Sequence, residues 1–181
     1  MSNFRFVFDD GLDSLKRVRH KVFLSYQHSL DQHYYDAFSR AFHDTYESIY
    51  DNSLERSIDS DDVDYVMRRI RENYITGTSC TLVLVGNQTA GRKYIDWELK
   101  ATLEKEHGLI GVQLPSAALN DEGKVLVPPR LADNIKSKYA LWVTWADITS
   151  SQARLDECIA EATSRSKTLI DNSRSRRLRN A

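Results

Sequence analysis

The acidic residue Glu98 lies between a tryptophan and a leucine in the segment KYIDWELK, which follows a polar loop with the sequence GNQTAGR. If a helix begins near Arg92, Glu98 falls at the margin of its apolar stripe, one turn beyond Tyr94. A half-sheltered carboxylate of this kind could face a cationic or polarised ligand. It could also be an edge-of-core glutamate in a charged helix, and the residues alone favour that second interpretation.

Short, nearly continuous apolar runs alternate with helical patterns along the chain. Strands are predicted near residues 21–26, 80–87, 108–115 and 139–145, with a weaker one at 47–53. Helices are predicted across 31–46, 63–74, 92–103 and 149–169, whereas 116–138 is predicted to be a turn and an extended loop. Apolar strands of this kind need cover on both faces of a parallel sheet. We therefore expect an α/β, flavodoxin-like three-layer sandwich with a parallel sheet of about five strands in the order 2-1-3-4-5.

The chain has 181 residues, of which 41% are hydrophobic and 28% charged, and its formal net charge is -1. This composition predicts one globular domain over 1–181, with a core at about 20–170, and gives no whole-chain bias towards nucleic acid. The basic residues of 171–181 are expected to form a solvated or frayed tail, and nucleic-acid contact by this tail is a weaker hypothesis. Cys80 and Cys158 lack metal-ligand spacing and are expected to be buried free thiols.

The sequence shows no apolar run long enough to span a membrane, and its first residues do not have the pattern of a signal peptide. We therefore expect a cytoplasmic protein.

Ligands of an open parallel sheet bind beyond the carboxyl ends of the strands, where the strand order reverses. In the predicted order, the loop 25–28 after the first strand lies beside the loop 86–89 after the third. Neither loop has the glycine pattern of a dinucleotide-binding turn or of a P-loop. The chain also lacks a GxSxG hydrolase motif, and its five histidines show no HExxH pairing, so no metal site is expected.

Two segments together resemble a known family, HKVFLSYQHS and CTLVLVGNQTAGRKYIDWELKATLEKEHGLIGVQLP. They are similar to the TIR-like family, formerly grouped as a domain of unknown function, which includes the TIR-like sensor proteins of Thoeris anti-phage defence. The resemblance extends over roughly residues 21–145. Its most specific part is an arginine and an aromatic residue at a helix start, with a glutamate four residues after the aromatic. That aromatic is usually tryptophan, whereas this chain has Tyr94 there and a tryptophan at position 97.

The resemblance implies that Glu98 is the catalytic residue for cleavage of the nicotinamide–ribose bond of NAD+. A fixed carboxylate stabilises the positive charge that develops on the ribose, or holds the ribose hydroxyl groups. The expected substrate-binding residues are Ser25, Tyr26, His28, Asp51, Asn52, Arg92 and Tyr94. Ordinary packing is an alternative for the two tyrosines, and a solvated position is an alternative for the histidine and the arginine.

The resemblance also implies partners. NAD+ is the expected substrate, with no further cofactor, and the expected product is a cyclic or otherwise modified ADP-ribose messenger that activates a separate effector protein. A phage protein is a possible trigger, and self-association is expected because TIR enzymes often complete a site between neighbouring subunits. The main alternative is a non-catalytic TIR-like interaction module, which would tolerate glutamine at position 98.

Overall fold

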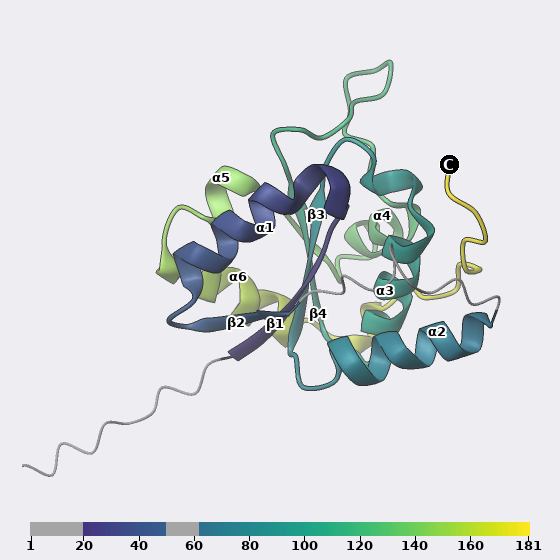
Figure 1. Cartoon of the computed structure of the whole chain (residues 1–181), viewed down its shortest axis with the longest axis horizontal. Coiled ribbons are helices and arrows are strands. Elements are labelled where there is room, and N and C mark those ends of the chain that lie inside the picture. The colour runs from purple at the N-terminus through teal and green to yellow at the C-terminus, as the bar shows by residue number, and fades with distance from the viewer. Residues whose placement is uncertain (1–19, 50–61) are drawn as a thin grey trace, which may run out of the picture.

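The computed structural model describes residues 20–49 and 62–181, and its centre is a five-stranded sheet in the order β2-β1-β3-β4-β5 (Figure 1). All neighbouring strands pair in parallel. The strands are β1 (His20–Ser25), β2 (Tyr46–Ile49), β3 (Cys80–Val85), β4 (Gly108–Gln113) and β5 (Leu141–Thr144). The predicted fold class and strand order are therefore confirmed. The last residues of the weak strand predicted at 47–53 lie outside the described residues.

Helices cover both faces of the sheet, as Figure 1 shows. The first face carries α1 (His28–Phe42), the short α5 (Trp145–Ile148) and α6 (Gln152–Ser164). The second face carries α2 (Val63–Arg69) with a π-helical turn at Ile70–Ile75, α3 (Lys93–Glu104) and α4 (Pro129–Lys136). Short 3-10 turns lie at Thr89–Gly91 and Lys167–Leu169. Within the described residues, no helix is both long and apolar enough to cross a lipid bilayer.

Neighbouring residues of β3 point to opposite faces of the sheet and enter different cores. Leu82 packs with Phe38 of α1, whereas Val83 packs with Leu99 of α3. Every residue of β3 is buried, and so is every residue of β4 except the last. Cover on both faces explains why these strands are continuous apolar runs rather than alternating patterns.

The strand order reverses between β1 and β3. From β1 the chain moves outwards to β2, and then returns past β1 to β3, where Ser25 lies opposite Val83. The carboxyl ends of β1 and β3 therefore form the crevice at which open α/β sheets bind ligands.

Two predictions about the second half of the chain are wrong, the second only in part. The stretch 116–138, predicted to lack a helix, contains α4. Its Pro129 lies in the first turn, where a missing N–H has no intrahelical partner to lose, so the proline pair starts a helix instead of preventing one.

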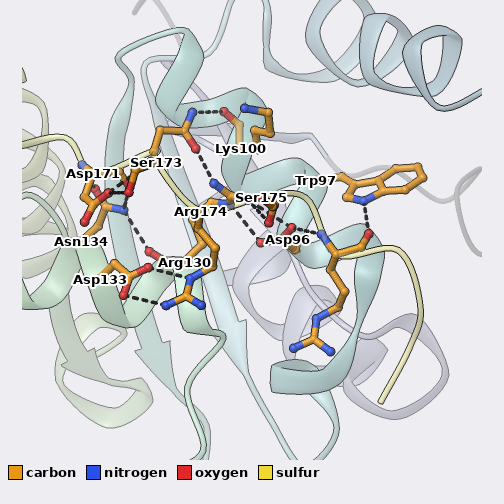
Figure 2. Close-up of polar contacts among 12 residues, drawn as sticks. Asp96, Trp97, Lys100, Arg130, Asp133, Asn134, Asp171, Ser173, Arg174 and Ser175 are labelled. Carbon is orange, nitrogen blue, oxygen red and sulfur yellow. Dashed lines mark hydrogen bonds and ion pairs between the residues drawn. The ribbon is translucent and has the colours of Figure 1, made fainter.

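The second prediction concerns residues 171–181, expected to be a solvated or frayed tail. Most of them are exposed to solvent, but the segment is docked and not frayed. They have no regular secondary structure after the turn at Lys167–Leu169, but they lie along α3 and α4 and form hydrogen bonds with both (Figure 2). The basic composition of the segment predicts only that its side chains are solvated, and it does not predict whether the backbone docks on the domain. Its docking depends on polar groups elsewhere in the chain, above all Asp96 and Arg130.

Candidate active site at the carboxyl ends of β1 and β3

Glu98 is buried, and it is held by the last residue of β1. The Ser25 hydroxyl donates a hydrogen bond of 2.5 Å to Glu98 Oε2. Ser25 is 1% exposed and Glu98 is 4% exposed. The carboxylate that the sequence singles out is therefore bonded to the carboxyl end of β1, at the strand-order switch.

The burial of Glu98 is deeper than the predicted position at the margin of an apolar stripe. The five consecutive residues of α3 from 95 to 99 are all buried, so this part of the helix is covered on every side. Ile95 and Leu99 pack into the core that contains Val83. Trp97 packs into a third apolar cluster with Phe23 and Met67. The segment 171–181 adds cover on the outside, where Arg177 bonds to both Asp96 and Trp97.

A pocket of about 260 Å³ lies one turn before Glu98 on α3. It is lined by Gln27, Ser29, Arg92, Tyr94 and Asn180. Two side chains of this lining have buried polar atoms that lack a hydrogen-bond partner among the described residues, namely Gln27 Oε1 and Arg92 Nε. Since an unsatisfied buried polar atom costs free energy, such atoms usually have a functional explanation. Two side chains that line the pocket thus each carry a buried polar atom, one an acceptor and one a cationic donor, whose hydrogen-bonding capacity is unused among the described residues.

The charge at the pocket is positive. Arg92 is the N-cap residue of α3, and Gln27 is the N-cap residue of α1, so the N-terminal ends of two long helices meet there. Helix N-termini carry partial positive charge and favour anions. Arg92 is itself oriented by a hydrogen bond to Gln88. An anionic group such as a phosphate suits this arrangement.

Tyr94 is an aromatic wall of the same pocket. Its ring lies edge-on to that of Trp97, with centroids 5.4 Å apart, and Lys93 Nζ lies 4.8 Å from the Tyr94 centroid. Tyr94 and Trp97 thus form one aromatic cluster, in which Trp97 packs against the Tyr94 ring that lines the pocket.

Tyr26 and His28 lie on the α1 side of the crevice. The Tyr26 ring is 3% exposed, stacks on Tyr35 with centroids 5.3 Å apart, and donates its hydroxyl hydrogen bond to Gln32 at 2.9 Å. The His28 ring lies 4.3 Å from that of Tyr26 and also contacts Gln32. Both rings therefore contact residues of α1, the Tyr26 ring from just before the helix begins. Asp51 and Asn52 lie outside the described residues.

Asp31 is a buried carboxylate at this edge of the sheet that the sequence analysis does not single out. It is 1% exposed, its Oδ1 accepts a hydrogen bond of 3.3 Å from the Ser116 hydroxyl, and its Oδ2 has no partner among the described residues. Burial raises the pKa of this carboxyl group, and the Ser116 hydrogen bond and the charge of His33 partly offset the rise. A signal was available, because Asp31 shares the helical spacing of buried Phe38 and Phe42.

Gly86, the residue after β3, allows the Asp31 carboxylate to approach the backbone closely. A Cβ atom at position 86 would lie 2.5 Å from Asp31 Oδ2, so this site requires glycine for steric reasons.

The family model for the TIR-like domain of the Thoeris protein ThsB matches residues 23–119, more than half of the chain and the whole of the Ser25–Glu98 site. The chain belongs to this ThsB TIR-like family. Membership implies a sensor of Thoeris anti-phage defence with a signalling role towards an effector. No curated protein matches the chain. The segment 171–181, which covers the outside of α3, lies beyond the matched residues of this ThsB-family protein.

Proposed function

We propose that this ThsB-family chain cleaves the nicotinamide–ribose bond of NAD+ and forms an ADP-ribose-derived signal. The observation that carries the proposal is the buried hydrogen bond from Ser25 to Glu98, which holds a carboxylate at the strand-order switch of a TIR-like fold. Fixed groups in sites shielded from water stabilise developing charge more effectively than the same groups in solvent.

The reaction breaks the bond between the ribose C1′ and the nicotinamide nitrogen. The bonding electron pair leaves with the ring, so that positively charged nicotinamide becomes neutral and the positive charge moves to the ribose as an oxocarbenium-like centre. The carboxylate of Glu98 stabilises that charge or holds the ribose hydroxyls. An oxygen or nitrogen nucleophile then bonds to C1′ and loses a proton, which gives ADP-ribose when the nucleophile is water and a cyclic or conjugated product otherwise.

The pocket next to Glu98 supplies the binding groups of the proposal. Arg92 and the N-termini of α1 and α3 engage the negatively charged pyrophosphate, because both the guanidinium and the helix dipoles favour anions. Tyr94 offers a flat surface for a base. Ser25 acts through Glu98, whose orientation it fixes.

The proposed signal passes to a separate effector protein. On this proposal, a trigger of phage origin raises the activity of the chain during infection, and the small-molecule product carries the signal onwards. Self-association between copies of the chain is part of the same proposal.

The test compares wild type with Glu98→Gln in phage-infected and uninfected cells, and follows NAD+ and ADP-ribose derivatives by mass spectrometry. The substitution keeps the shape of the side chain and removes its charge. Glu104→Gln, on the same helix but in contact with Arg71 and Lys100, is the matched control. We expect NAD+ loss and a new product with wild type and the control, and neither with Glu98→Gln. If Glu98→Gln retains the product, or if no phage elicits one from wild type, the enzyme proposal fails and the non-catalytic module takes its place.

A further inference from the structure

The segment 171–181 runs back along α3 from its C-terminal end to its N-terminal end. Its contacts follow the helix in reverse order and are Asn172 with Lys100, Arg177 with Trp97 and Asp96, Asn180 with Lys93, and Ala181 with Gly91. Figure 2 shows the first part of this path beside α3. A chain without regular secondary structure therefore follows the outer side of α3 from Lys100 to Lys93.

The base of the segment is anchored by two fully buried side chains of α4. Asn134 is fully buried and bonds the Asp171 backbone twice, at 2.7 Å through its Nδ2 and at 3.0 Å through its Oδ1. Arg130, also fully buried, donates to Asn172 Oδ1 at 2.6 Å. Residues 171–172 thus form a fixed base, and we call residues 173–181 the strap.

The far end of the strap forms one wall of the pocket that lies one turn before Glu98. The Lys93 backbone N–H donates to Asn180 Oδ1 at 2.9 Å, and the Ala181 backbone N–H donates to the Gly91 carbonyl at 3.0 Å. These two bonds place Asn180 as one wall of the pocket that also includes Gln27 and Arg92. The strap therefore occupies the N-terminal end of α3, where an anionic ligand would be expected to bind.

The pocket with this wall in place is small for a dinucleotide. Its volume of about 260 Å³ is below the roughly 300–1,000 Å³ of pockets that bind drug-sized ligands, and NAD+ is larger than most such ligands. The unpartnered buried atoms of Gln27 and Arg92 lie in side chains that line the same space. Removal of Asn180 from the lining would enlarge the pocket and open these groups to a larger ligand.

The strap is held by polar contacts and buries little apolar surface. Its one large apolar side chain, Leu178, is 75% exposed. Its ion pairs, Arg174 with Asp133 and Arg176 with Asp64, are exposed to solvent and so contribute little. A hollow of about 430 Å³, lined by residues such as Asp96 and Arg174, remains between the strap and the domain. Segments with few apolar contacts open locally without unfolding of the core.

We propose that the strap is an autoinhibitory element that holds the pocket beside Glu98 closed in the resting chain, and that its release admits the dinucleotide. This inference rests on the proposed NAD+-cleaving function and adds its regulation. An activating partner then needs only to bind the strap, or to displace it from the N-terminal end of α3. By population shift, the apparent Kd of a ligand equals its intrinsic Kd divided by the fraction of chains in which the strap is open.

Gly91→Ala tests the proposal, because the added methyl group would clash with the last residue of the strap. A Cβ at position 91 would lie 2.2 Å from the Ala181 carbonyl oxygen, and the three nearest atoms all belong to Ala181. Asn180→Ala removes the bond to Lys93 and part of the pocket wall. Leu178→Ala, in the strap but largely exposed, is the matched control. ADP-ribose serves as a probe that the enzyme does not cleave at the nicotinamide bond, and its affinity for the full chain is measured by calorimetry.

We expect Gly91→Ala and Asn180→Ala to bind ADP-ribose about tenfold more tightly than wild type, which corresponds to about 1.4 kcal/mol of strap docking. Leu178→Ala should match wild type. Both strap variants should also consume NAD+ without infection. Equal ADP-ribose affinity in all four proteins would overturn the strap and leave the proposed function standing. Absence of ADP-ribose binding even in the strap variants would overturn the proposed function itself.

Amide hydrogen exchange gives a second readout that needs no ligand. In wild type, the Lys93 and Arg177 amides should be protected, since they donate to Asn180 and Asp96. Gly91→Ala should speed exchange at Lys93 and leave the amides of β3 unchanged. Fast exchange at both amides in wild type would show that the strap is not docked, and would overturn the inference.

Discussion

The Ser25 hydroxyl donates a hydrogen bond of 2.5 Å to Glu98 Oε2, although the two residues are 73 positions apart in the chain. The bond joins the last residue of β1 to the middle of α3, and so connects the two sides of the crevice. Hydrogen bonds to ionised acceptors are short and strong, and they fix the orientation of the acceptor. Ser25 is therefore a positioning residue for the carboxylate on which the proposed reaction depends.

Replacing Ser25 with alanine is expected to lower kcat for NAD+ cleavage by about ten- to a hundredfold, because a hydrogen bond to a charged group contributes about 1.5–3 kcal/mol. KM should change little, since the pocket that contacts the rest of the substrate is left intact. Steady-state kinetics measure both constants. A rise in KM at constant kcat would show instead that Ser25 contacts the substrate directly.

The coupling between Ser25 and Glu98 can also be measured without activity. A double-mutant cycle on the free energy of unfolding compares Ser25→Ala in the wild type with Ser25→Ala in Glu98→Gln. If the hydroxyl acts on the charged carboxylate, its removal should cost less in the Glu98→Gln background. Equal costs in both backgrounds would contradict the assignment.

The buried ion pair between Asp96 and Arg130 is expected to be a strong determinant of stability. Arg130 is fully buried and donates to Asp96 Oδ1 from Nε at 2.9 Å and to Oδ2 from Nη2 at 3.3 Å. Arg130→Met should lower the free energy of unfolding by about 3–5 kcal/mol, because it leaves Asp96 buried without its charge partner. Denaturant titration measures the loss.

Two further variants make this prediction specific. In the double variant Asp96→Asn, Arg130→Met both charges are gone, so stability should partly recover relative to Arg130→Met alone. Lys124→Met breaks an exposed pair with Glu122 and should cost no more than about 1 kcal/mol. A double variant less stable than Arg130→Met would show that the charges contribute through other contacts.

The sheet was predictable from the sequence because each central strand is an apolar run bounded by polar loops. In β3 every residue is apolar or buried, as expected for a strand of a parallel sheet that is covered on both faces. The helix α4 and the strap were not predictable. Pro128 and Pro129 are compatible with either a loop or a helix start, and only the packing of Leu131 decides between them. The strap is polar, and its backbone groups form hydrogen bonds that dock it. The types of its side chains do not predict such bonds.

In the site, too, some features could be predicted from the sequence and others depend on the folded surroundings. The spacing alone favoured an edge-of-core position for Glu98, and the family resemblance made it the catalytic candidate. The predicted topology placed the loop that begins at Ser25 at the strand-order switch. Gln27 and Arg92 carry buried atoms without partners, a property that depends on the folded surroundings and not on the sequence. The depth at which Glu98 is buried depends likewise on cover from all sides of α3, part of which comes from residues more than seventy positions away.

Asp31 is expected to make stability depend on pH. Burial raises its pKa above the ordinary value of 3.8, so the folded state holds the proton more tightly than the unfolded state does. The contribution of Asp31 to the free energy of unfolding should therefore be greatest below pH 3.8. It should fall as the pH rises from there through the folded-state pKa. The slope for one proton is at most about 1.4 kcal/mol per pH unit.

Asp31→Asn should remove this component and flatten the pH dependence across the same window. Urea denaturation at a series of pH values, with Asp121→Asn as an exposed control, measures the difference between the curves. The variant should gain stability relative to wild type as the pH rises. Parallel curves for wild type and Asp31→Asn would contradict the predicted rise in pKa.

The two tyrosines of the predicted cleft should respond differently to substitution. Tyr94 lines the pocket, so Tyr94→Ala should raise KM for NAD+ roughly tenfold, in line with about 1–3 kcal/mol for aromatic stacking on a base. Tyr26→Phe removes a hydroxyl that bonds Gln32 within packed surroundings, so it should lower the free energy of unfolding by about 1 kcal/mol and leave KM unchanged. Kinetics and denaturation on both variants, with Tyr94→Phe to retain the ring, separate the two roles. A raised KM in Tyr26→Phe would place Tyr26 at the substrate instead of in the core.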